Sequence, residues 1–404
     1  MLKAFNFLTF YFIVLFHCPA FSKDLLNYSA NYEEARKAFL DKTAKLKKEY
    51  SDSKSYSLKV PSSIDNDLTI DAFHLKFSKA NNNKILVLCS GVHGLEAAVG
   101  SFVQALIMLP NFIGILEKSK VDLLLVHAIN PYGFKYHRRV TENNVDLNRN
   151  FVLKDNFDDI KNDDYTKLRD FLQPKENLEL GFFDKTLFYL KSIFYMSKYS
   201  IKTLRWAILS GQYEYSTGLY FGGKKYEPHK ELVETLLGRI FKKYEAIHLI
   251  DIHTGYGQRA KLHLFPNPIR KDLRPYLSKL YSDEVINYGD ESEDFYSTTG
   301  EFSGYFYKFM PNKNILPMVW EFGTADNHKA IKSIDSIHTM IIENQGHHHG
   351  YAHGKTKAKV NSKILELFNP KDIAWKKEIK KQSIEMLEKV ILRFGKMTFK
   401  VNKN

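Results

Sequence analysis

The segment with the clearest chemical potential runs from Gly91 to Glu96 and places a histidine and a glutamate three residues apart. An apolar run, Ile85 to Leu88, precedes it and small residues follow, which predicts the junction of a buried strand and a helix. Side chains at this spacing project from one face of a helical turn, roughly 5–6 Å apart. His93 and Glu96 could therefore supply two of the three protein ligands of a catalytic zinc site. A capping glutamate beside a surface histidine is the alternative, so other pieces of the site are required.

Two later apolar runs end in residues of the same kind. The first ends with Asp251 and His253, which point to the same side of an extended chain. We expect His253 to be the third ligand and Asp251 to be a candidate outer partner; a hydrogen-bonded core histidine is the alternative. The second run ends with Trp320 and Glu321. Partial desolvation beside the indole would raise the pKa of Glu321 and suit a general base, whereas an exposed strand-end glutamate is the alternative.

Arginines are concentrated in a polar loop after another apolar strand. Arg138 and Arg139 are adjacent, and Arg149 stands between Asn148 and Asn150. Arg149 has the donors to grip a carboxylate in bidentate fashion, and Arg139 could polarise a carbonyl oxygen. A solvated surface turn is the alternative.

The elements that must position these residues alternate between strands and helices, which predicts crossover connections and a largely parallel α/β sheet. We expect one domain over residues 23–404, with a helical insertion at about 160–210 that could roof a cleft. Packing is the expected role of the insertion's apolar residues, Phe182, Phe183, Leu187, Leu190 and Phe194. The predicted strands span residues 55–60, 68–77, 84–90, 121–129, 246–253 and 315–319, and the predicted helices residues 32–50, 97–109, 228–244, 328–344 and 372–394.

Composition places the chain among globular proteins. Its 404 residues are 44% hydrophobic and 26% charged, so a full core is available. The net charge of +13 favours acidic polymers, anionic membrane surfaces or acidic peptides as partners. Without an arginine-rich helix or zinc-finger spacing, however, nucleic-acid binding is not expected.

The first 22 residues have the pattern of an export signal. Lys3 precedes an apolar run from Phe5 to Phe16, and a small-x-small pattern ends at Ser22. We expect a periplasmic or secreted protein with no stable membrane span after cleavage; an uncleaved anchor is the alternative. Only Cys89 would then remain, so no internal disulfide forms, and we expect this thiol to be a buried hydrophobic residue.

Taken in order, these motifs resemble the signature of the zinc carboxypeptidases of the carboxypeptidase A type over roughly residues 60–350. A bacterial branch of that superfamily, of unestablished substrate, is further resembled by the run Gly211-Gln212-Tyr213 and by residues 343–350. The motifs of the signature are His93-x-x-Glu96, Asn130-Pro131-x-Gly133, Val145 to Phe151, Asp251-x-His253 and Trp320-Glu321-Phe322-Gly323.

The resemblance implies a three-layer α/β/α fold, one Zn²⁺ ion and hydrolysis of a C-terminal peptide bond. It assigns the zinc ligands to His93, Glu96 and His253, and the general base to Glu321. It also implies that Asn148 and Arg149 hold the substrate carboxylate, and that Arg139 stabilises the oxyanion, with Arg138 as the other choice. The substrate-capping tyrosine has three candidates, Tyr256, Tyr296 and Tyr305.

Two other functions remain open. A deacylase of N-acyl amino acids would use the same zinc apparatus, and a non-catalytic exported protein would use the arginine cleft to bind acidic ligands. A histidine cluster, His347 to His349 with His353, could bind metal adventitiously, but we expect it to lie at a helix end.

Overall fold

The computed structural model describes residues 29–77, 82–266, 269–288, 299–326 and 329–399, so the predicted signal segment lies outside the described residues. Within this part of the chain seven strands form one mixed sheet in the order β1-β2-β4-β3-β5-β7-β6. The four central strands are parallel, and β1, β2 and β6 join antiparallel at the edges. The predicted largely parallel α/β sheet is confirmed. The strands are β1 Lys54–Lys59, β2 Thr69–Leu75, β3 Lys84–Ser90, β4 Val121–His127, β5 Ala246–Gly255, β6 Leu262–Phe265 and β7 Asn314–Gly323.

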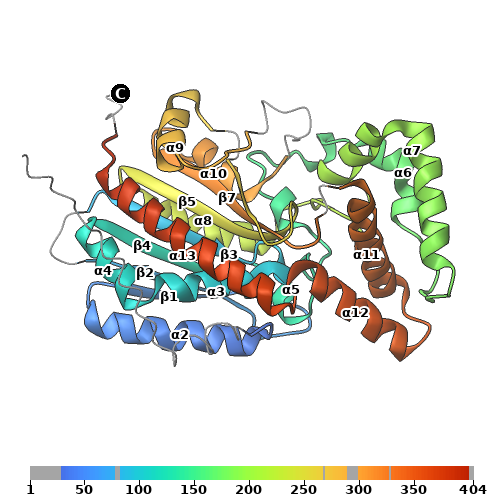
Figure 1. Cartoon of the computed structure of the whole chain (residues 1–404), viewed down its shortest axis with the longest axis horizontal. Coiled ribbons are helices and arrows are strands. Elements are labelled where there is room, and N and C mark those ends of the chain that lie inside the picture. The colour runs from blue at the N-terminus through green and yellow to red at the C-terminus, as the bar shows by residue number, and fades with distance from the viewer. Residues whose placement is uncertain (1–28, 78–81, 267–268, 289–298, 327–328, 400–404) are drawn as a thin grey trace, which may run out of the picture.

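Helices cover both faces of the sheet and give three layers. Strand β3 shows why, since Leu86 and Leu88 belong to one apolar cluster while Ile85, Val87 and the buried thiol of Cys89 belong to another. Alternate residues of a central parallel strand are buried on opposite faces, so neither face is polar. In Figure 1, α13 crosses in front of the sheet and α8 lies behind it. The helices are α2 Tyr32–Glu49, α3 Ala97–Ile107, α4 Pro110–Lys118, α5 Pro131–Lys135, α6 Asp163–Leu172, α7 Asp184–Leu209, α8 Pro228–Phe241, α9 Arg274–Leu280, α10 Phe302–Phe309, α11 Ala330–His349, α12 Gly354–Phe368 and α13 Ile373–Lys396.

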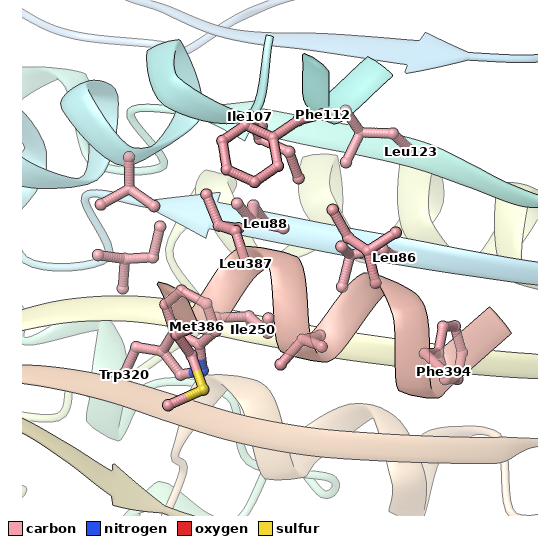
Figure 2. Packing of buried hydrophobic residues seen from close by; sticks show 14 of the residues in the cluster. Leu86, Leu88, Ile107, Phe112, Leu123, Ile250, Trp320, Met386, Leu387 and Phe394 are labelled. Carbon is pink, nitrogen blue, oxygen red and sulfur yellow. The ribbon is translucent and has the colours of Figure 1, made fainter. Parts of the chain in front are cut away.

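The C-terminal helix α13 closes the front layer. Figure 2 shows Leu387 and Phe394 of this helix against Leu86 and Ile250 of the central strands. Trp375 is also buried, and its indole N–H donates to the carbonyl of Gly323 over 2.8 Å. The helix predicted at residues 372–394 is confirmed, and it packs on the strands whose ends carry the site.

Helices α6, α7, α11 and α12 form a lobe beside the sheet, on the right in Figure 1. Helices occupy the segment where the insertion was expected, and one face of α7 packs on α6 and α11 through Phe188 and Tyr195. The expectation that packing accounts for the insertion's apolar residues was wrong, because all five lie on the solvent side. They are Phe182, Phe183, Leu187, Leu190 and Phe194, with exposed fractions of 92%, 71%, 51%, 60% and 58%.

The histidine cluster falls where it was expected. His347, His348 and His349 form the last turn of α11, which ends at Gly350 with a φ of 86°.

Within the described ranges, no single helix combines the length and the apolar composition of a membrane span. The segment Gly94–Ile107, which includes α3, and helix α4 together reach that length and composition, but the chain bends by 66° between them.

Candidate metal centre

Three side chains from two strand ends converge at the carboxyl edge of the sheet. His93 follows β3, Glu96 ends a 3-10 turn that leads into α3, and His253 lies on β5. One ligand atom from each lies within 4.8 Å of the others. All three residues are buried, with at most 4% of their surface exposed. The structure therefore brings together the three predicted ligands.

The atoms that face one another have the right chemistry for a cation. Nδ1 of His93 lies 3.1 Å from Nδ1 of His253, and the two nitrogens lie 2.9 Å from Oε1 and Oε2 of Glu96 respectively. Two ligands of a tetrahedral zinc ion at about 2.1 Å are roughly 3.4 Å apart, so the donor set needs to open by only a few tenths of an ångström. Two imidazole nitrogens in such contact also repel one another unless a proton or a metal ion lies between them.

The outer nitrogen of each imidazole is anchored by a carboxylate. Nε2 of His253 lies 2.6 Å from Oδ2 of Asp251, and Nε2 of His93 lies 3.1 Å from Oδ1 of Asp146. On His253, a proton held on Nε2 leaves the Nδ1 lone pair for a metal. Nε2 of His93 also lies 2.8 Å from Nη2 of Arg139, which can only donate, so this nitrogen faces a guanidinium as well as a carboxylate. Asp251 is thus an outer partner, as the spacing indicated. Asp146 was not assigned a role from the sequence, although it lies within the Val145 to Phe151 motif.

Electrostatics of the cluster favour binding of positive charge. Burial lowers the pKa of His253, but Asp251 and Glu96 more than offset this effect and raise it well above its usual value. Burial would raise the pKa of Glu96, yet the two histidines hold it below its usual range. Glu96 is therefore a carboxylate at neutral pH, and its charge favours the protonated form of His253.

A close approach of two turns fixes the start of the site. A Cβ added to Gly94 would lie 2.0 Å from the carbonyl carbon of Gly133. The N–H of Gly94 also donates to the carbonyl of Arg139 over 3.1 Å. The His93-x-x-Glu96 turn and the Asn130-to-Gly133 turn are therefore packed backbone against backbone, which delivers Arg139 to the ligands.

Glu321 lies next to the ligand set without belonging to it. Its register partner on the adjacent parallel strand is His253, and its Oε1 accepts the N–H of Tyr256 over 2.8 Å. Burial, and next the negative charge of Glu96, raise the pKa of Glu321 to about 8. Trp320 is not the cause that the sequence suggested, because its indole faces the opposite side and donates to the hydroxyl of Tyr281 over 3.0 Å.

The adjacent residues Arg138 and Arg139 bond to different parts of the protein. Arg139 Nη1 donates to Oε1 of Glu96 and its Nε to Oδ2 of Asp146, each over 3.2 Å, so its charge lies at the ligand set. Its guanidinium also lies 5.3 Å from the ring centre of Tyr220. Arg138 instead donates from Nε to Glu343 of α11 over 3.0 Å and is buried. The assignment of Arg138 to substrate is therefore corrected, since its charge is neutralised in the fold.

The predicted carboxylate grip is only partly available. Nη1 and Nη2 of Arg149 donate to the carbonyls of Asn148 and Leu209, each over 2.7 Å. Its buried Nε has no hydrogen-bond partner within the described chain. Two of its five N–H groups are therefore taken by the backbone, and a grip on a carboxylate would use the remaining ones, Nε–H among them. Asn148 accepts the N–H of Phe302 over 2.9 Å, which holds the start of α10 beside this arginine.

Besides Asp146, two residues near the ligands were given no role by the sequence analysis. Glu301 is a buried acid whose Oε1 has no partner in the part of the chain that the structure describes, and burial, then the charge of Asp251, raise its pKa to about 8. Tyr220 has a positive φ of 54°, an unusual conformation for a bulky residue. Only the glycine- and tyrosine-rich character of residues 211–223 hinted at a role for this loop.

The tyrosine candidates are also separated by the structure. Tyr256 is 43% exposed and adjoins Glu321 through its backbone, so it remains a candidate. Tyr305 is buried and its hydroxyl bonds to Glu234, away from the ligands. Tyr296 lies outside the described residues.

The fold and the cluster define an α/β protein with a candidate metal centre at the carboxyl edge of its parallel strands. The chain belongs to the family described as "Protein of unknown function (DUF2817)", whose model matches residues 28–382. A search of curated proteins finds no match.

Solved structures similar to the chain include a carboxypeptidase A and a metallo-carboxypeptidase. Bovine thrombin-activatable fibrinolysis inhibitor is 14% identical, with a TM-score of 0.45 over 85% of this chain and 99% of that chain. Carboxypeptidase A from Helicoverpa armigera is 12% identical, with a TM-score of 0.45 over 85% and 74% of the two chains. The metallo-carboxypeptidase from Burkholderia cenocepacia is 9% identical, with a TM-score of 0.40 over 82% and 66%. Likeness at this level carries no information on activity, which must be argued from the site.

Proposed function

We propose that the chain is a zinc-dependent hydrolase that removes the C-terminal amino acid from a peptide. The observation that carries this proposal is the buried cluster of His93, Glu96 and His253 with Glu321 beside it in register. Two imidazoles and one carboxylate are the ligands of catalytic zinc sites, and a fourth acid outside the set can serve as the base.

The chain's own residues account for the remaining steps. A zinc ion in the cluster would act as a Lewis acid and lower the pKa of water to about 7. Glu321 accepts a proton from the attacking water as the new carbon–oxygen bond forms. It returns this proton to the amine nitrogen as the carbon–nitrogen bond breaks. The guanidinium of Arg139, beside Glu96, stabilises negative charge on the former carbonyl oxygen.

The carboxylate of the substrate is proposed to bind at Arg149. Its Nε is buried without a partner among the described residues, and an unpaired buried donor is costly unless a ligand satisfies it. Asn148 and the start of α10 adjoin it. A carboxylate there would place the last peptide bond of the substrate between Arg149 and the ligand cluster.

One experiment tests the proposal against its rivals. Purified full-length protein is assayed for bound metal, and its zinc-loaded form is incubated with a peptide library and with N-acyl amino acids, read by mass spectrometry. Stoichiometric zinc and loss of single C-terminal residues are expected. Cleavage restricted to N-acyl amino acids would replace the peptidase by a deacylase, and failure to bind zinc would leave a non-catalytic binding protein.

We also propose that the protein is exported, on the basis of the apolar run from Phe5 to Phe16. Mass spectrometry of the mature N-terminus after expression with the full leader tests this: a chain that begins at Lys23 is expected, and an intact Met1 contradicts cleavage.

A further inference from the structure

The exposed apolar face of α7 is the least expected surface of the molecule. Phe183, Leu187, Leu190 and Phe194 follow the spacing i, i+4, i+7 and i+11, so they form one stripe along the helix. More than half of each side chain is exposed. Ile193, which is 56% exposed, widens the stripe. Phe182, which is 92% exposed, extends the stripe into the chain that precedes the helix.

The opposite face fixes the orientation of this helix. Phe188 packs against Phe171 with ring centres 5.1 Å apart and against His338 of α11 at 4.4 Å. The hydroxyl of Tyr189 donates to Asp335 over 2.7 Å. The stripe is therefore held outward by the packing of the other side, and Figure 1 places α7 at the outer edge of the lobe.

The patch is larger than the surface of a monomer normally tolerates. Together, these six residues expose as much surface as nearly four fully exposed large apolar side chains. At roughly 180 Å² for each side chain, the exposed apolar area is about 700 Å². The largest apolar patch of a typical monomer is about 300–600 Å² and is often functional. The face is therefore expected to be covered by a partner.

Charge around the stripe indicates the kind of partner. Lys191 and Lys198 follow Leu187 and Phe194 by four residues each, so both lie along one edge of the stripe, and both are exposed. Over the whole of α7 the sequence has five basic residues and one acid, within a chain of net charge +13. Apolar side chains bordered by lysine suit a surface that is both apolar and anionic.

We propose that α7 docks on the surface of an anionic lipid bilayer, with the stripe between the headgroups and the upper acyl chains and with Lys191 and Lys198 on lipid phosphates. A second copy of the chain suits this face less well. A stable dimer buries about 800 Å² on each partner with complementary shape, whereas this stripe is a convex helix. An antiparallel two-fold contact along it would also bring the lysine edges together. Surface docking needs no spanning helix and does not depend on the proposed hydrolase activity.

Vesicle binding by the full-length protein tests the proposal. The probes are vesicles of phosphatidylglycerol and phosphatidylcholine in equal parts, and vesicles of phosphatidylcholine alone. The double variant Leu187→Ser/Phe194→Ser is expected to bind the anionic vesicles at least about tenfold more weakly. Lys191→Glu/Lys198→Glu should lose the preference for them. The matched control, Ile64→Ser/Val285→Ser, removes two residues that are 62% and 78% exposed elsewhere and should bind normally.

A tryptophan probe on α7 distinguishes lipid contact by this helix from lipid contact by the apolar N-terminal run. In Phe183→Trp, the indole emission should shift to the blue on anionic vesicles and be quenched by brominated lipid, while Ile64→Trp should show neither change. Thermal midpoints of all variants should match the parent, since every altered side chain is exposed. Equal binding of the serine variants, or a dimer in solution that Leu187→Ser/Phe194→Ser abolishes, would overturn the proposal.

Discussion

Oδ1 of Asp146 lies 3.1 Å from Nε2 of His93, although the two residues are 53 positions apart in the chain. Asp251 makes the equivalent contact to His253 over 2.6 Å. A carboxylate thus lies against the outer nitrogen of each imidazole, and Nη2 of Arg139 also lies 2.8 Å from that of His93. The protein sets the direction of the ligand nitrogens before any ion binds.

Removal of either anchor should weaken metal binding. Asp251→Asn and Asp146→Asn are each expected to lower zinc affinity about 10–100-fold, because a neutral amide replaces the carboxylate, orients the imidazole less firmly and lowers its basicity. Competition with a chromogenic chelator measures the effect. Asp170→Asn, at an acid that is 81% exposed, is the matched control. Unchanged affinity in both anchor variants would contradict the assignment.

Zinc uptake should release a proton at neutral pH. The pKa of His253 is raised well above its usual value by Asp251 and Glu96, so the metal-free side chain is protonated and a metal must displace that proton. Affinity should therefore rise with pH, by up to about tenfold per unit, until the pKa of His253 is passed. Calorimetry in two buffers of different ionisation enthalpy counts the proton. An affinity that is constant between pH 6 and 8 would contradict this prediction.

Glu321→Gln should retain zinc and lose activity. General-base catalysis is worth about 10²–10⁴ in rate, and the amide cannot accept the proton. In the parent, kcat/KM should rise with pH as Glu321 ionises. Burial and Glu96 raise the pKa of Glu321 to about 8, but a zinc ion nearby would favour the carboxylate, so the midpoint of the profile should lie below 8. The variant should lack this dependence. Glu385→Gln, at an exposed position of α13, is the control, and a fully active Glu321→Gln enzyme would eliminate the base.

Adjacent arginines should fail in different ways. Arg138→Ala breaks a buried ion pair with Glu343 and should lower the free energy of unfolding by about 3–5 kcal/mol. Arg139→Lys should retain the fold and zinc but lower kcat about 10²–10³-fold, because the planar donor set facing the oxyanion is lost. Urea unfolding and steady-state kinetics separate the two. Equal stability loss in both variants would show that Arg139 is also structural.

Gly94 should tolerate no side chain. The added methyl of Gly94→Ala would meet the backbone of Gly133 at 2.0 Å, so we expect a loss of roughly 1–3 kcal/mol in unfolding free energy together with weaker zinc binding. Gly114→Ala provides the opposite control. Nothing lies within 4 Å of its Cβ in helix α4, and the change should stabilise the protein by about 0.5–1 kcal/mol. Thermal unfolding compares the two, and a Gly94→Ala protein as stable as the parent would show that the turns can separate.

Much of the site could be predicted because its residues stand where apolar strands end. His93, His253 and Glu321 each follow or terminate a run that β-propensity identifies, and parallel strands bring their carboxyl ends to one edge of a sheet. The same reasoning gave the sheet type and the buried faces of β3 and α13. These features depend on local pattern, which the sequence contains.

Contacts set by tertiary packing could not be predicted. Asp146, one partner of His93, lies 53 residues away, and two N–H groups of Arg149 bond to backbone carbonyls that no pattern reveals. The periodicity of α7 showed which residues share a face but not whether another element covers that face. Trp320 is a different case, because alternation along β7 is a local pattern and it already indicates that this ring points away from Glu321.

The pairing of His253 with Glu321 across β5 and β7 has a consequence for how such a protein can diversify. Neighbouring strands lie about 4.8 Å apart in a sheet, so the separation between the backbones of these two residues is set by the sheet itself. The loops that follow these strands can be lengthened, shortened or exchanged between lineages without a change in that separation. Selectivity and reactivity are therefore free to evolve on separate parts of the polypeptide.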